Sequence, residues 1–237
     1  MLSILPFFGS QKTNSQLKDI VQWDAGNWSL AIDFFDKHID WSMVQNGLEL
    51  GAHTGGLSLW LALKGKQVVC SDLDNPQSRA ELLHRCHNLN HISYQAIDAT
   101  DIPYQSYFDV IVFKSMIGGI GRNQQKHLQA RAFLQIYQAL KPGGYLLFAE
   151  NLLGSFVHQY LRQHFVSWGD SWRYITLQEC QEFLRPFKTY TLRTTGILGA
   201  LGRSEFQRQW LARIDQSGLS ACCPPNWHYL VYGVAQK

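Results

Sequence analysis

Three acidic residues and two glycines stand where a chain could hold a nucleoside. Glu49 and Asp72 lie at the ends of two short apolar runs, and Asp98 ends a third. Gly51 and Gly55 follow the first run, where a missing Cβ lets the backbone approach a ligand closely. Carboxylates at such positions accept hydrogen bonds from ribose hydroxyls or from a base edge. The set therefore predicts a site for a cationic nucleoside that carries a free ribose diol.

The turn "GAHTGG" after the first run argues against a phosphate ligand. A phosphate-cradling loop of the GxxxxGK[ST] type needs a lysine after its glycines, and none follows here. The dinucleotide pattern GxGxxG needs a second glycine, and His53 stands in its place. A side chain there would keep a pyrophosphate at a distance.

The pattern of apolar residues predicts the elements that must position this set. Residues 15–38 carry apolar positions at helical spacing, which predicts one or two helices before the first strand. Strands are expected at 47–52, 67–72, 92–98, 107–114 and 145–151, and they alternate with helices at 56–65, 76–90 and 124–140. Because these strands are nearly all apolar, they should form a parallel sheet that is covered on both faces.

The remaining part of the chain follows a looser pattern. Helices are expected at 155–165, 176–184 and 202–215, and strands at 187–198 and 227–236. Two closing strands separated by a long excursion favour an antiparallel pair added to the sheet. The fold class is thus α/β: a doubly wound, mostly parallel, Rossmann-like sheet of seven strands with an antiparallel last strand and N-terminal helices.

Five stretches in this order resemble one known family. They are "LELGAHTGG", "VVCSDLD", "IDATDIPY", "FDVIVFK" and "LKPGGYLLFAE", and they resemble the class I S-adenosylmethionine-dependent methyltransferases. The resemblance covers about residues 46–151. It implies one domain over 1–237, with an N-terminal helical cap at 1–45, a cofactor-binding core at 46–151, and an acceptor-side elaboration with closing strands at 152–226.

The family's cofactor, S-adenosylmethionine, would be held by residues that match its motifs. The resemblance implies roles for Glu49, Gly51, His53 and Gly55 beside the methionine part and ribose, Asp72 at the ribose hydroxyls, Leu73 on the adenine, Asp98 and Ala99 at the adenine edge, and Lys114 at the loop over the reacting methyl. His53 departs from the family's usual glycine. Because this cofactor has no phosphate, a side chain that points away is tolerable there.

A hydroxyl acceptor would also need a base to take its proton. Loops at the carboxyl ends of the fourth and fifth strands offer Lys114, His127, Glu150 and His158 as candidates. Lys114 ends an apolar strand, where burial would lower its pKa. The alternative for Lys114 is an ion pair with Glu150 on the neighbouring strand end.

Several acceptors are argued against by missing motifs. Adenine and glutamine N-methyltransferases carry Asn/Asp-Pro-Pro-Tyr after the fourth strand, where this chain has "KSMI", and the Pro-Cys pair of cytosine enzymes is absent. A net charge of +3 and no basic appendage argue against nucleic acid. We expect a small-molecule or saccharide acceptor, modified at a hydroxyl oxygen. A quinone or polyketide acceptor, or a non-catalytic scaffold on the same fold, are the alternatives.

Composition places the protein in a broad class. Five cysteines without framework spacing favour reduced thiols and a cytoplasmic location. No run is long enough to span a membrane, and the apolar start "MLSILPFFG" is expected to dock on the domain or, less favourably, on a membrane surface. His84, His87 and His91 could mimic a metal face, but no carboxylate or cysteine pair accompanies them, so no metal is expected. The sequence also permits a homodimer.

Overall fold

The computed structural model describes residues 14–89, 91–166 and 171–237. Its strands are β1 (Asn46–Leu50), β2 (Gln67–Asp72), β3 (Ile92–Ala96), β4 (Phe108–Lys114), β5 (Leu140–Asn151), β6 (Thr189–Thr195) and β7 (Leu230–Gln236). They form one seven-stranded sheet in the order β3-β2-β1-β4-β5-β7-β6. Neighbouring strands from β3 to β5 pair in parallel, whereas β7 is antiparallel to both β5 and β6. The predicted fold class is confirmed. The apolar start of the chain lies outside the described residues.

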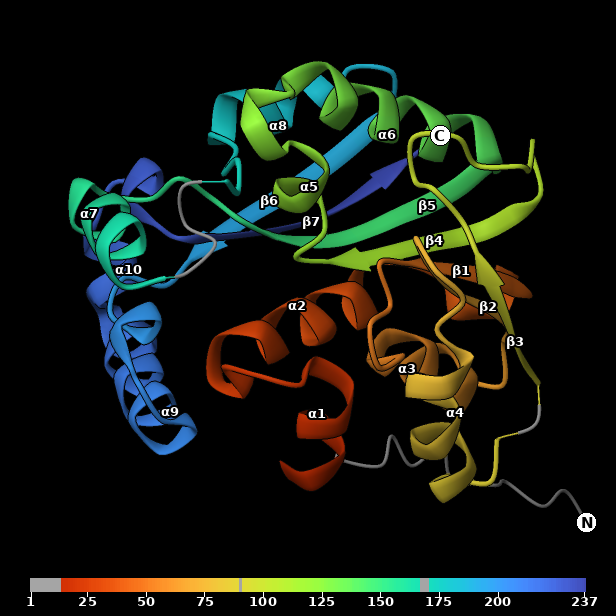
Figure 1. Ribbon diagram of the computed structural model, residues 1–237, viewed down its shortest axis with the longest axis horizontal. Coiled ribbons are helices and arrows are strands. Elements are labelled where there is room, and N and C mark those ends of the chain that lie inside the picture. Colours follow the sequence, from red (N-terminus) through yellow and green to blue (C-terminus); the bar gives the residue numbers. More distant parts are fainter. Residues whose placement is uncertain (1–13, 90, 167–170) are drawn as a thin grey trace, which may run out of the picture.

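Helices cover both faces of the sheet (Figure 1). One face carries α1 (Asn14–Val21), α2 (Ala25–His38), α3 (Gly56–Leu63) and α4 (Gln77–Cys86); the other carries α5 (Ile117–Ile120), α6 (Lys126–Ala139) and α8 (Leu177–Phe183). Beyond the end toward which β4 points lie α7 (Phe156–Phe165), α9 (Glu205–Ile214) and α10 (Ser220–Cys222). Between these elements lie five short helical turns in the described part of the chain: η1 (Trp41–Met43), η2 (Arg122–Gln124), η3 (Gly199–Leu201), η4 (Asp215–Leu219) and η5 (Pro225–Trp227).

The two faces of the sheet build two separate cores because side chains alternate along each strand. In β4, Ile111 and Phe113 pack with α6 and α8, whereas Val110 and Val112 pack with α2 and α3. The first core contains an aromatic group in which Phe113 lies 5.5 Å from Phe148 and 5.8 Å from Phe133 between ring centroids. Apolar residues on both faces of a strand are what the parallel arrangement requires.

The fifth strand differs from its prediction at its start. It begins at Leu140 rather than near Tyr145, directly where α6 ends. The register against β4 shifts between Phe108, which pairs with Leu140, and Val110, which pairs with Tyr145. The intervening "KPGG" forms an irregular strand segment, because Pro142 has no N–H to donate and bulges accommodate such residues.

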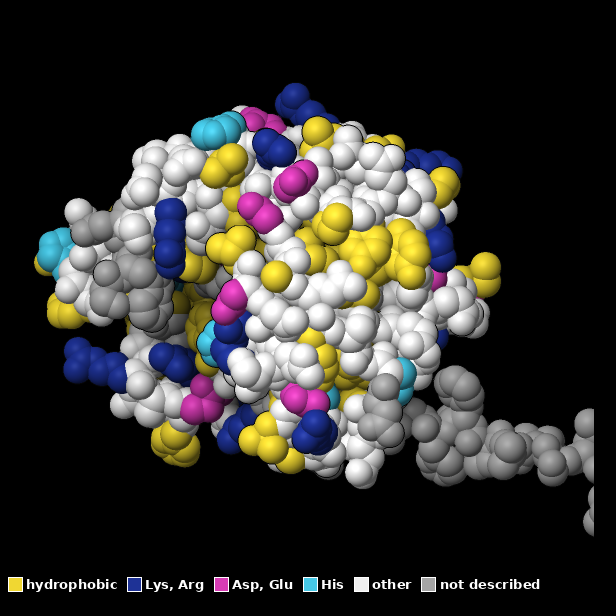
Figure 2. Space-filling view, turned by 45° about the vertical axis from the view of Figure 1, so that its right-hand side comes forward, with side chains coloured by type: hydrophobic (Ala, Val, Ile, Leu, Met, Phe, Trp, Pro, Cys, Tyr) yellow, Lys and Arg dark blue, Asp and Glu magenta, His cyan; other side chains and the backbone are white. Residues whose placement is uncertain are grey.

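The surface mixes charges of both signs. On the face shown in Figure 2, basic and acidic side chains are interspersed rather than gathered by sign. Within the described part of the chain, no helix is both long and apolar enough to cross a membrane. All five cysteines lie in that part, and each is a free thiol.

Candidate functional site

The glycine turn after β1 uses left-handed backbone at three positions. The φ angles are +64° at Gly51, +50° at His53 and +76° at Gly55. Glycine adopts this conformation freely, whereas it costs an ordinary residue about 1–2 kcal/mol. His53 therefore has a backbone conformation that glycine would adopt without strain. Its side chain is exposed, away from the buried part of the turn.

A pair of substitutions tests this description of the turn. His53→Gly should leave the free energy of unfolding unchanged or raise it by up to about 1 kcal/mol, because relief of strain is partly offset by glycine's greater freedom when unfolded. Gly55→Ala should lower it by about 2–4 kcal/mol, since the new Cβ would add backbone strain and overlap. That Cβ would lie 2.6 Å from Cε1 of His84. Urea unfolding of both variants measures the difference; equal effects would contradict the left-handed turn.

His84 anchors the end of the same turn. Its Nε2 donates to the carbonyl of Gly55 at 2.9 Å, and its Nδ1 accepts from the Tyr94 hydroxyl at 2.8 Å. The ring is buried, and burial lowers its pKa, so the neutral form fits both bonds. The other two histidines of this pattern have separate partners, since His87 contacts Asp19 and His91 contacts a helix carbonyl. The three rings thus have structural contacts of their own.

Glu49 connects the end of β1 to the start of α3, the helix that follows the glycine turn. Its two carboxylate oxygens accept from the backbone N–H groups of Leu57 and Ser58, at 3.1 and 2.7 Å, at the start of α3. These are N–H groups that the helix cannot satisfy itself, and a carboxylate suits the positive end of a helix dipole. Complete burial raises the pKa of Glu49 to about 7. Both oxygens are therefore engaged in shaping the loop.

Asp72 lies beside the turn at the carboxyl end of β2. It accepts from the backbone N–H of His53 at 2.9 Å and from that of Leu73 at 2.8 Å. Arg79 reaches it only at 3.5 Å, because the guanidinium pairs with Asp74 at 2.7 and 2.8 Å. The Leu73 side chain is 74% exposed. A carboxylate and an open apolar side chain therefore adjoin the turn.

The next strand end brings a third acidic residue to this edge. The backbone N–H of Ile97 donates to the carbonyl of Asp72, so the segment after β3 runs along the end of β2. Asp98 accepts from the N–H and the hydroxyl of Thr100, both at 2.8 Å, and its side chain is exposed. Ala99 is buried behind it. The structure thus brings the predicted cofactor-binding residues of β1, β2 and β3 to one edge of the sheet.

Lys114 ends β4 under the N-terminal helices. Its Nζ donates to the carbonyl of Val21 at 2.6 Å and lies 4.6 and 5.1 Å from the ring centroids of Trp28 and Trp23. Burial lowers the pKa of Lys114 to about 7, against the opposing pull of nearby carboxylates. The alternative, an ion pair with Glu150, does not form in the described part of the molecule. The Lys114 ammonium instead contacts the last carbonyl of α1 and the rings of Trp23 and Trp28.

Glu150 is the residue before the last of β5, and its carboxylate oxygens accept hydrogen bonds from backbone N–H groups. They accept from the N–H groups of Met116, Ile117 and Asn151 at 2.7–2.8 Å. The side chain is fully buried, and burial raises its pKa to about 7. Met116 in turn packs on Gly51, where an added Cβ would lie 2.9 Å from its Cγ. Glu150 thereby fixes the residue that covers the glycine turn.

The two histidine candidates lie in different surroundings. His158 is buried, with Nε2 donating to the carbonyl of Ile197 at 2.7 Å and Nδ1 accepting from Ser155, so neither nitrogen is open. Burial lowers its pKa. His127 is exposed in the first turn of α6, and the neighbouring Lys126 points to Glu182 on α8. Among the described residues, no contact joins His127 to the glycine turn.

A buried polar group that the sequence interpretation missed lies next to Lys114. The Tyr229 hydroxyl donates to Asp24 at 2.5 Å and accepts from Asn27 at 2.8 Å. Oδ1 of Asp24 and Oδ1 of Asn27 are buried without a partner in the described part of the molecule. Burial raises the pKa of Asp24 to about 6. In the sequence, the stretch "WDAGN" could have indicated this group, because small and acidic residues interrupt the helical pattern there.

Burial of Lys114 should make stability depend on pH. In the folded protein its pKa is about 7 instead of 10.5, so between these values the unfolded chain holds a proton that the folded protein has released. The free energy of unfolding contributed by Lys114 should therefore rise with pH, by up to about 1.4 kcal/mol per pH unit. Urea unfolding of the wild type and of Lys114→Met from pH 7 to 9 measures this. A constant difference between the two would contradict it.

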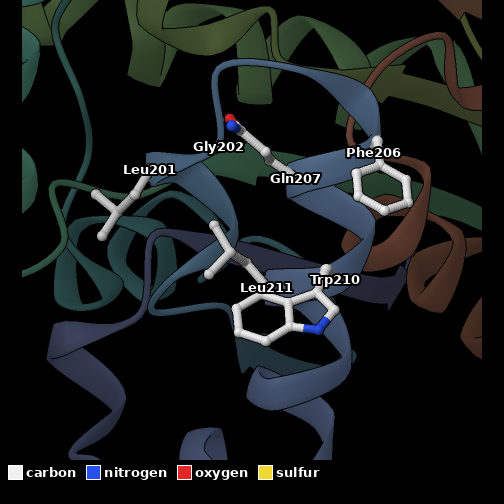
Figure 3. A pocket seen from close by; sticks show the side chains of 6 residues that line it. All are labelled: Leu201, Gly202, Phe206, Gln207, Trp210 and Leu211. Atoms are coloured by element: carbon white, nitrogen blue, oxygen red, sulfur yellow. The ribbon is translucent and has the colours of Figure 1, made fainter.

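Two open cavities among the described residues lie outside the glycine turn. One, of about 350 Å³, lies along α9 and is lined by Leu201, Gly202, Phe206, Gln207, Trp210 and Leu211, with the two rings projecting outward (Figure 3). Phe206 is 80% exposed. The other, of about 370 Å³, lies between α7 and the start of α8. Neither is lined by the glycine turn.

Comparison with known proteins finds a family model that matches the middle part of the chain, including this end of the sheet. Residues 48–148 match the family model described as a methyltransferase domain. This range contains the glycine turn, Asp72, Asp98 and Lys114. No curated protein matches the chain.

Solved structures share the fold at low identity. Phosphoethanolamine N-methyltransferase 2 of Haemonchus contortus, in complex with S-adenosyl-L-methionine, is 19% identical with a TM-score of 0.61, over 97% of this chain and 58% of that chain. The YcgJ protein of Bacillus subtilis is 13% identical (TM-score 0.60; 89% and 98%). The N-methyltransferase NodS of Bradyrhizobium japonicum is 17% identical (TM-score 0.56; 90% and 96%). The chain thus spans little more than half of the first of these proteins.

Proposed function

We propose that this chain transfers the methyl group of S-adenosylmethionine to a hydroxyl of a small-molecule or saccharide acceptor. The proposal starts from residues 48–148, which match the model of a methyltransferase domain. The observation that carries the proposal is the position of Asp72. Its carboxylate lies 2.9 Å from the backbone of the glycine turn at His53, beside the open side chain of Leu73. This is the arrangement that a ribose diol and an adenine ring need.

The residues present fit a cofactor that has no phosphate. Arg79, which contacts the turn at the carbonyl of His53, is held by Asp74 and is not free for a phosphate. In the proposed complex the ribose hydroxyls donate to Asp72, the adenine packs on Leu73, and its edge meets Asp98 and Ala99. Glu49 keeps its place under the loop, where its two hydrogen bonds hold the start of α3.

When bound, the cofactor supplies a methyl group already activated on a sulfonium. The chain's own task is to orient the acceptor and to exclude water. α1 serves the second task, because it packs on the first residue of α3: a Cβ on Gly56 would lie 2.1 Å from the carbonyl of Ile20. Lys114 and the two tryptophans hold the end of α1 at Val21. The first residues after the glycine turn are thus covered.

Of the four candidate bases, Lys114 suits the role best. Glu150 and His158 use their acceptor atoms within the fold, and His127 lies out on α6. The pKa of Lys114 lies near 7, and its nitrogen has one hydrogen-bond partner among the described residues. A base works best when its pKa is close to the working pH. We propose that the neutral amine of Lys114 accepts the proton of the acceptor hydroxyl.

The test supplies labelled S-adenosylmethionine with acceptors that differ in the receiving atom. Sugar nucleotides offer hydroxyls, phosphoethanolamine offers an amine, and a hydroquinone offers a phenol. We expect S-adenosylhomocysteine and a methyl ether only with a saccharide hydroxyl, detected by mass spectrometry. Transfer to phosphoethanolamine or to the hydroquinone alone would overturn the acceptor assignment, and cofactor binding without any transfer would favour a scaffold.

A further inference from the structure

The cavity between α7 and α8 lies at the same end of the sheet as the proposed cofactor site. It has a volume of about 370 Å³ and is lined by Gln124, Leu153, Gln159, Arg162, Gln163, Trp172, Arg173, Tyr174, Thr176 and Glu179. Leu153 is the second residue after β5, so the cavity opens at the carboxyl end of that strand. In open α/β sheets this is the end where ligands bind.

The short helix α5 and its first flanking residue contact both the glycine turn and the lining of the cavity. At its start, Met116 packs on Gly51 of the turn. Two and three residues later, Gly118 and Gly119 pack directly on the ring of Trp172, which lines the cavity. The backbone of Gly118 also accepts a hydrogen bond from Arg173. A molecule in the cavity would therefore lie close to the site where the methyl group is offered.

Arg162 gives the cavity its chemical character. Its guanidinium stacks on the Tyr174 ring, with 3.9 Å between Cζ and the ring centroid. Nη1 donates to the carbonyls of Leu152 and Leu153 at 2.7 and 3.1 Å, which fixes the plane of the group. Nε and Nη2 have no hydrogen-bond partner, and no carboxylate pairs with Arg162, among the residues that the structure describes. A fixed, partly buried cation without a carboxylate in ion-pair contact is uncommon in proteins.

The other charges of the lining cancel each other. Arg173 pairs with Glu179 at 2.5 Å and donates to Gln129 at 2.6 Å, so its own charge is compensated. Two arginines and one glutamate leave one positive charge, and it belongs to Arg162. Gln163 adds an amide without a partner in the described part of the chain. Hydrogen-bond donors and one cation without an ion pair among the described residues thus line the cavity.

We propose that this cavity binds an anionic group of the acceptor, a phosphate or a carboxylate, with Arg162 as the residue that recognises it. The guanidinium presents Nε and Nη2 side by side, a geometry that matches two oxygens of either anion. The rings of Tyr174 and Trp172 suit the apolar face of a sugar or an aromatic body. The inference rests on the proposed methyl transfer, since it names the class of acceptor: an anionic one.

The experiment uses three sugars that differ only in charge. Glucose 1-phosphate carries a phosphate, glucuronate carries a carboxylate, and glucose is neutral. Ligand-observed NMR titration of the full chain with S-adenosylhomocysteine present should give dissociation constants of about 1–10 mM for at least one anion, and at least tenfold weaker binding of glucose. The tighter of the two anions identifies the group.

Three variants assign the binding to the cavity. Arg162→Gln should weaken binding of the anion at least tenfold, and Tyr174→Leu should weaken it several-fold by removing the stacked ring. Arg185→Gln removes an exposed arginine at the end of α8, outside the cavity, and should change nothing. Equal binding of all three sugars, no binding of either anion, or an unchanged Arg162→Gln variant would overturn the inference.

Failure here is distinct from failure of the proposed function. Arg162 is not among the residues assigned to the cofactor, so S-adenosylmethionine should bind Arg162→Gln as it binds the wild type. If the protein binds the anion but not S-adenosylmethionine, the anion site in the cavity stands and the proposed methyl transfer is contradicted. If it binds S-adenosylmethionine but neither anion, the proposed cofactor site stands and the anion site is contradicted.

Discussion

Replacing Asp72 by alanine should weaken S-adenosylmethionine binding about 30- to 1,000-fold. The substitution removes the carboxylate that would accept both ribose hydroxyls, and such charge-assisted hydrogen bonds would together contribute about 2–4 kcal/mol. The fold should tolerate the change, because the backbone N–H groups that Asp72 accepts from in this structure, at His53 and Leu73, are exposed to water. Calorimetric titration measures the affinity, and urea unfolding verifies the fold.

Asp74→Ala is the matched control. Asp74 lies two residues along the chain, carries the same charge, and binds the same Arg79 more closely, at 2.7 Å. Its side chain is 71% exposed. Cofactor affinity should stay at the wild-type value in this variant. Equal losses in the two variants would mean that charge in general, rather than the Asp72 carboxylate, attracts the cofactor.

Glu150→Ala should lower the free energy of unfolding by about 3–5 kcal/mol, because several buried donors would lose their acceptor. The carboxylate accepts from the backbone of Met116, Ile117 and Asn151, and the side chain is 0% exposed. Water cannot readily replace it there. The free energy of unfolding of Glu150→Gln should lie between those of the wild type and Glu150→Ala, since the amide oxygen of glutamine can still accept a hydrogen bond. Urea unfolding monitored by tryptophan fluorescence gives the values.

Glu182→Ala serves as the control for a glutamate of another kind. Glu182 pairs with Lys126 between α8 and α6, near the surface, at 2.9 Å. Ion pairs in contact with water contribute little to stability. The unfolding midpoint of this variant should stay close to that of the wild type. If Glu150→Ala were equally mild, Glu150 would not be needed to hold α5.

Much of the fold was predictable because its strands are local features. Residues such as Val110 to Phe113 are apolar without interruption, and this favours a strand covered on both faces. The ends of those strands carry Asp72 and Asp98, so their meeting at one edge follows from the parallel order. The positions of residues at strand ends can be predicted from the local pattern of apolar residues and from the order of the strands.

The contacts that organise the site were not predictable in the same way. His84 reaches the carbonyl of Gly55 across 29 residues, and Tyr229 reaches Asp24 across 205. No local pattern encodes such pairs. The sequence shows that Glu150 and His158 are titratable, and they were therefore predicted as candidate bases. Their hydrogen bonds to backbone groups depend on the three-dimensional fold and could not be predicted from the sequence.

Calorimetric titration of the wild-type protein with S-adenosylmethionine, and separately with NADH, tests the proposed function most directly. The glycine turn, Asp72 and the absence of a free phosphate-binding cation in the turn predict a dissociation constant of about 1–100 µM for S-adenosylmethionine and no binding of NADH. Binding of NADH, or no binding of S-adenosylmethionine, would contradict the assignment of this edge of the sheet.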